Sequence, residues 1–120
     1  MRTKGQIEDE LAKEFTKFYV KKLKTGPKQA KVYIVDDMIL VRLKGDLHPY
    51  EEILLSRGKH GIELVKQIRE HIHETVIDET KKIIHDVTKM KVTSFHSDSS
   101  TRTGERFEIF ILDRNFEKTL

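Results

Sequence analysis

A chain of 120 residues is the length of one domain, and folding at this size buries roughly two-thirds of the surface that the unfolded chain exposes. The absence of cysteine excludes disulfides, thiolate metal sites and cysteine nucleophiles, and it suits a reducing cytoplasm. Lys and Arg number 23 against 20 Asp and Glu, so the net charge of +3 predicts solubility rather than a polyanionic partner.

The first predicted element is a helix at about residues 4–24. Thr3 and Gln6 have the spacing of a capping box, apolar residues recur every three or four positions from Ile7 onward, and a glycine-proline pair at 26–27 supplies the stop. The start of the chain lacks the apolar core of a signal peptide, and no apolar run approaches the ~20 residues of a membrane span. We therefore expect a cytoplasmic protein that is not inserted into a membrane.

The next predicted element is a β-hairpin at residues 31–45, where β-branched and apolar residues are interrupted only by Asp36-Asp37. Apolar residues occupy both alternating sets of positions, so both faces of this hairpin look buried. Gly45–Pro49 break the strand, and Pro49 suits the first turn of a short helix that ends at Leu55.

The second half repeats the order of the first. A long helical stripe runs from Ile62 to Thr88, an extended run follows at 91–96, and an apolar strand occupies 107–112. We predict a single α+β domain with halves at about 1–45 and 61–120. It is a two-layer sandwich in which a helix-strand-strand unit occurs twice, with a short extra helix and with two long helices on one face of a four-stranded, mainly antiparallel sheet.

The polar segment between the last two strands is the most distinctive one for chemistry. It combines hydroxyls with a histidine, two carboxylates and two guanidiniums, and His96 and Asp98 share a face at strand spacing. Catalytic triads are normally assembled from distant positions, however, and no G-x-S-x-G elbow is present. We interpret the segment first as a hydrogen-bonded loop scaffold and second as an anion or partner contact, and we predict no catalytic residue, no metal site and no cofactor.

A second motif, Gly58-Lys59-His60-Gly61, lies between the two later helices. This GxxG and the order of the elements resemble the type II KH domain, whose GxxG loop clamps single-stranded nucleic acid. The preceding Leu55-Ser56-Arg57 and the additional strand at 107–112 depart from that family's pattern. Single-stranded RNA binding through these four residues is the alternative functional hypothesis.

The segments TKGQIEDELAKEF, VYIVDDMILVRLKGDLHPYE and HSDSSTRTGERFEIFIL resemble the MpsC-like or YbcI-like family, named for a component of a sodium-translocating membrane-potential-generating system. The resemblance covers nearly the whole chain. It implies a soluble, non-catalytic accessory or regulatory module that serves a bacterial membrane system for cation or inorganic-carbon transport and reaches the membrane through a partner protein. It also implies a functional loop at the signature positions His96, Asp98, Ser100, Thr101, Thr103, Gly104, Glu105 and Arg106.

The predicted strands carry more apolar surface than two helices on one face can cover. Phe107, Ile109 and Ile111 are expected to meet the helices, and only the short helix at 49–55 is left to shield the opposite face. An uncovered patch of this size marks an interface, so we predict a homodimer. Its predicted interface residues are Tyr33, Val35, Met38, Leu40, Phe110 and Leu112.

Overall fold

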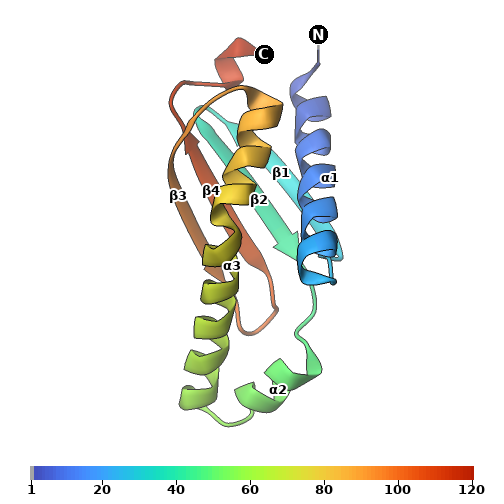
Figure 1. Ribbon diagram of the computed structural model, residues 1–120, viewed down its shortest axis with the longest axis vertical. Coiled ribbons are helices and arrows are strands. Elements are labelled where there is room, and N and C mark those ends of the chain that lie inside the picture. Colours follow the sequence, from blue (N-terminus) through green and yellow to red (C-terminus); the bar gives the residue numbers. More distant parts are fainter. Residues whose placement is uncertain (1) are drawn as a thin grey trace.

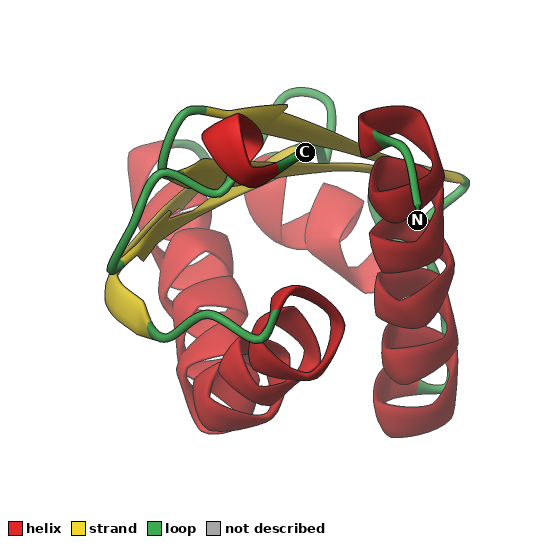
Figure 2. Ribbon diagram, turned by 90° about the horizontal axis from the view of Figure 1, so that it is seen from above, coloured by secondary structure: helices red, strands yellow, loops and turns green. Residues whose placement is uncertain are grey.

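The computed structural model describes residues 2–120 as a two-layer α+β structure. Its elements are α1 (Lys4–Leu23), β1 (Gln29–Val35), β2 (Met38–Lys44), α2 (Pro49–Leu55), α3 (Lys59–Thr88), β3 (Val92–Ser99), β4 (Arg106–Leu112) and a short 3-10 helix, η1 (Glu117–Thr119). The strands form one antiparallel sheet in the order β1-β2-β4-β3. Both long helices lie on the same face of this sheet (Figures 1 and 2), which confirms the predicted fold class.

Helix α1 forms where its capping residues predicted it. The Thr3 hydroxyl accepts the Gln6 amide hydrogen at 3.2 Å, and the Gln6 side chain accepts the Thr3 amide hydrogen at 2.8 Å. The helix ends at Lys24, which takes a left-handed conformation with φ of 62°. Four side chains one turn apart are buried against the sheet, namely Ile7, Leu11, Phe15 and Tyr19.

The side chains of strand β4 point to the opposite faces of the sheet from those that we predicted. Phe110 and Leu112, predicted to be on the uncovered face, are 0% and 3% exposed and face the helices. Alternation along the strand then puts Phe107, which is 39% exposed, on the opposite face with the two isoleucines of β4. The predicted orientation of β4 is wrong because the charged residues Arg106 and Glu108 are buried on the helix side.

The uncovered face of the sheet, called the open face below, is apolar in its centre. It carries Tyr33, Val35, Met38, Leu40, Phe107, Ile109 and Ile111, which register brings together across β1, β2 and β4. Tyr33, Val35 and Phe107 are each about 40% exposed. Four of the six residues predicted for a dimer interface therefore lie on this face, and Phe110 and Leu112 do not.

Helix α2 does not shield the open face, contrary to expectation. It packs against the first half of α3, and together they project beyond the sheet (Figure 1). We call α2 and residues 59–72 of α3 the arm. A methyl group on Gly61 would overlap the Leu54 carbonyl oxygen, so glycine is what lets the two helices of the arm approach so closely. Gly58 precedes α3 with φ of 78°, and the remaining residues of the GxxG motif form the first turn of α3 rather than a separate loop.

Candidate functional site: a polar cavity between the arm and the sheet

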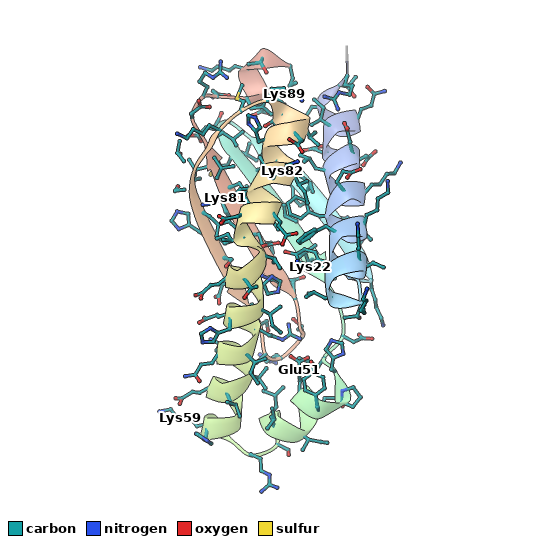
Figure 3. The ribbon with its side chains drawn as sticks, viewed as in Figure 1. Lys22, Glu51, Lys59, Lys81, Lys82 and Lys89 are labelled. Atoms are coloured by element: carbon teal, nitrogen blue, oxygen red, sulfur yellow. The ribbon has the colours of Figure 1, made fainter. Side chains whose placement is uncertain are left out.

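A cavity of about 480 Å³ lies where the arm meets the sheet. Its walls come from the end of α1, the connection from β2 to α2, both helices of the arm and the start of β4. Figure 3 shows Glu51 of α2 at this junction, beside the turn between β3 and β4. The volume lies within the range of about 300–1,000 Å³ that small-molecule sites occupy.

Arg106 is the buried charge at the sheet end of the cavity. The residue is 5% exposed, and its Nη2 donates to the Ser97 hydroxyl at 2.8 Å. Its Nε lies 3.9 Å from Glu108 Oε2, which is too long for a hydrogen bond, and within residues 2–120 this buried nitrogen has no hydrogen-bond partner. An unpaired buried donor lowers the stability of a fold by about 1–3 kcal/mol, so the position of Arg106 is not explained by its own hydrogen bonds.

Glu108 is joined to α1 through Tyr19, which α3 approaches in turn. The Tyr19 hydroxyl donates to Glu108 Oε1 at 2.8 Å and lies 3.5 Å from His73 Nδ1. Burial raises the pKa of Glu108, although the Tyr19 hydrogen bond and the Arg106 charge oppose the increase. Burial, followed by the positive charges of Arg106 and Arg69, lowers the pKa of His73 to about 3. The imidazole is therefore neutral at physiological pH.

Arg69 and Glu51 form the second ion pair of the cavity. Arg69 Nε and Nη2 donate to the two carboxylate oxygens of Glu51 at 2.6 and 2.8 Å, and Nη1 donates to the Gly104 carbonyl at 3.3 Å. Burial favours the neutral form of Glu51, but the Arg69 hydrogen bonds and the His48 amide outweigh it, so the pKa of Glu51 lies below its ordinary value. This pair is charge-balanced and connects α2, α3 and the β3–β4 turn.

The comparisons with known proteins identify the family. A family model described as "Na+-translocating membrane potential-generating system (MpsC)" matches residues 3–114. The chain belongs to the MpsC family. The uncharacterized protein YbcI of Bacillus subtilis (strain 168) is 41% identical over 119 residues, which cover 99% of this chain and 95% of that protein. No solved structure matches the chain. Within residues 2–120, no helix combines the length and the apolar composition that crossing a membrane requires.

The MpsC signature positions form the end of the β3–β4 hairpin. The Ser100 hydroxyl accepts the amide hydrogens of Arg102 and Thr103 at 3.2 and 3.4 Å, and the Thr103 hydroxyl accepts that of Glu105 at 3.2 Å. Gly104 takes a φ of 77°, which glycine adopts without strain. These contacts support the interpretation as a loop scaffold, and a functional role for the whole loop stays a prediction.

The structure brings only two of the MpsC signature positions to the cavity, Gly104 and Arg106. Glu105 instead pairs with Arg42 at 2.8 Å. His96 pairs with Ile109 across the strands and is exposed, which places it and Asp98 on the side of the sheet away from the helices. The remaining positions, Ser100, Thr101 and Thr103, belong to the turn.

Sequence reasoning missed most of the cavity. The residues it did not single out are Tyr19, Glu51 and Arg69 of the wall and Glu108 beside Arg106. One signal was present, because Arg106 and Glu108 alternate with the same period as Phe110 and Leu112 and so had to share a face with them. The other alternating set, Phe107, Ile109 and Ile111, made the opposite orientation look more favourable.

The GxxG motif lies away from the cavity, at the far end of the arm. Lys59, labelled in Figure 3, and His60 are exposed there, whereas Gly61 is buried against α2. Gly61 thus has a packing role that needs no ligand. RNA binding at Gly58–Gly61 stays an untested prediction.

Proposed function

We propose that this chain is a non-catalytic accessory module of a bacterial membrane-potential-generating system, acting in the transport of a cation or of inorganic carbon. The observation that carries the proposal is the match of the MpsC family model, with its description, to residues 3–114. The proposed place of action is the cytoplasm, at the membrane surface through a partner protein.

The groups of the cavity support a role without catalysis. A general acid or base works best with a pKa near the operating pH. The pKa of His73 is lowered to about 3, and burial followed by the Glu108 carboxylate raises the pKa of Tyr19 far above neutrality. Arg69 is fully engaged by Glu51 and Gly104. These side chains are suited to holding a ligand rather than to moving its protons.

The transport role is tested in membrane vesicles from cells with and without the gene, using a potential-sensitive dye during a pulse of Na⁺, with K⁺ as the control cation. We expect the sodium-dependent potential to fall without the gene and to return when the chain is supplied again. A parallel uptake assay with labelled bicarbonate separates the two cargoes. Unchanged potential and unchanged uptake would show that the proposal is wrong.

The proposal includes a homodimer formed through the open face. A second copy presents the same apolar surface, as a two-fold interface requires. Seven apolar side chains at roughly 40–80 Å² each give about 300–550 Å² per copy, or about 600–1,100 Å² for both. Stable interfaces bury about 1,200–2,000 Å² in total, so we expect a dimer that dissociates on dilution through the micromolar range.

Sedimentation velocity over a concentration series tests the dimer. Val35→Lys puts a charge on the open face and is expected to give a monomer at every concentration. Val20→Lys is the matched control, because Val20 on α1 is 49% exposed and lies on the other side of the molecule. A wild-type chain that stays monomeric at high micromolar concentration, or equal behaviour of both variants, would contradict the interface.

A further inference from the structure

The two arginines of the cavity are not equally neutralised. Glu51 binds Arg69 through two hydrogen bonds and keeps its negative charge, because its pKa is lowered. Glu108 does not bind Arg106 in this way, since the nearest approach of Arg106 Nε to Glu108 is 3.9 Å. Glu108 instead accepts the Tyr19 hydroxyl. Arg106 lines the cavity, and its charge is not matched by a carboxylate at hydrogen-bond distance.

The balance of charge at the sheet end favours an anion carrying one charge. Burial raises the pKa of Glu108 and so favours its neutral form, whereas an arginine guanidinium stays protonated in proteins. The buried ionisable groups at the cavity, Arg69, Arg106, Glu51 and Glu108, then carry a surplus of at most one positive charge. Of the exposed charges on the wall, Lys28 is paired with Asp46 at 2.7 Å, and Lys44 is left to attract an approaching anion without being buried with it.

Part of the remaining wall is apolar. Leu23, Leu43, Leu47 and Ile72 contribute aliphatic surface, and the ring of Tyr50 stacks on His48 with the ring centres 5.3 Å apart. A small inorganic anion would leave this surface without contacts. A ligand with an apolar body beside its charged group would use both parts of the wall.

We propose that the cavity binds a small organic monocarboxylate, whose carboxylate accepts a hydrogen bond from Arg106 and whose apolar body packs against the leucines and Ile72. The site is independent of the transport role, because it rests on the cavity and on the unmatched charge of Arg106 in its wall. No bond is made or broken in the ligand.

Thermal unfolding of the full chain at low salt, with a titration of added anions, tests the site. Benzoate and hexanoate at up to about 10 mM are expected to raise the melting temperature in a saturable way. Benzamide, which lacks the charge, formate, which lacks the apolar body, and phosphate, which carries a second charge near neutral pH, are expected to raise it much less. No shift with either monocarboxylate, or an equal shift with benzamide or phosphate, would overturn the proposal.

Two variants locate the binding. Arg106→Met removes the charge-assisted hydrogen bond and is expected to weaken benzoate binding roughly ten- to hundredfold. Ile72→Trp fills the cavity from a position that is 36% exposed, and is expected to abolish the shift even if Arg106→Met does not fold. Ile68→Trp, one turn earlier on α3 at 38% exposure and outside the cavity wall, is the control that keeps the shift. Equal shifts in Ile72→Trp and Ile68→Trp would place the ligand elsewhere.

Discussion

Replacing Gly61 by alanine tests how the arm is held together. The added methyl group would overlap the Leu54 carbonyl oxygen and would lie 2.7 Å from its carbonyl carbon and 3.2 Å from Arg57 Cβ. Two of these three atoms belong to the backbone of α2, which cannot rotate away as a flexible side chain can. The change therefore requires α2 and α3 to move apart.

The expected change in the free energy of unfolding combines one stabilising effect with two destabilising ones. Inside a helix, alanine is more favourable than glycine by about 0.5–1 kcal/mol. Overpacking in a close contact costs about 1–3 kcal/mol, and separation of the helices also loosens the Glu51 carboxylate from Arg69, where charge-assisted hydrogen bonds contribute about 1.5–3 kcal/mol. We expect a net loss of about 1.5–5 kcal/mol, or about 6–20 °C in melting temperature for a chain of this length.

Urea and thermal denaturation followed by far-UV circular dichroism measure this loss. Gly5→Ala is the matched control, because Gly5 lies in α1 with no atom within 4 Å of the added methyl group, and it should stabilise the protein by about 0.5–1 kcal/mol. Trypsin gives a local readout, since Arg57 precedes the α2–α3 contact and should be cleaved faster in Gly61→Ala. If Gly61→Ala stabilises the chain as much as Gly5→Ala does, the close crossing of α2 and α3 is wrong.

Two further stability predictions follow from the termini and the cavity. His73 has a pKa of about 3 in the folded chain against about 6.5 when unfolded, so the unfolded state binds the extra proton between these values and stability falls as the pH is lowered. From pH 7.5 to pH 5 we expect the free energy of unfolding of the wild type, measured by urea titration, to fall by about 1–2 kcal/mol more than that of His73→Asn. Glu108 contributes in the opposite direction in both proteins, so the comparison removes its effect. Equal pH dependence of the two proteins would contradict the burial of His73. Thr3→Ala removes the capping box of α1 and should lower the free energy of unfolding by about 0.5–2 kcal/mol in urea titrations. The control is Thr93→Ala at an exposed position, which should lower it less.

The elements with local signals could be predicted from the sequence. Thr3 and Gln6 cap the helix that they precede, and each needs only the other. The first hairpin likewise turns at Asp36, which takes a φ of 55°, because aspartate tolerates the left-handed region better than most residues do. Signals of this kind act over a few residues, so a single sequence contains them.

The orientation of β4 could not be predicted in the same way. Both alternating sets of its residues contain apolar side chains, and the set that faces the helices also contains two charged residues, against the usual rule that charges face water. Burial of Arg106 and Glu108 is tolerated because Ser97 and Tyr19 provide hydrogen bonds from β3 and α1. Those partners are 9 and 89 positions away along the chain, and only the packed fold brings them together.

The cavity and the MpsC signature are connected by position rather than by shared chemistry. A methyl group on Gly104 would lie 3.1 Å from the Gly45 carbonyl oxygen, so the β3–β4 turn packs tightly against the connection from β2 to α2, which forms one wall of the cavity. The same turn receives Arg69 from the arm at the Gly104 carbonyl and is followed directly by Arg106. Most of the hydroxyls in the signature shape the turn, and the shape of the turn fixes where Arg106 enters the sheet. A ligand-binding role of the signature therefore depends on Arg106, while the exposed His96 and Asp98 face a different surface, the one proposed to meet a second copy.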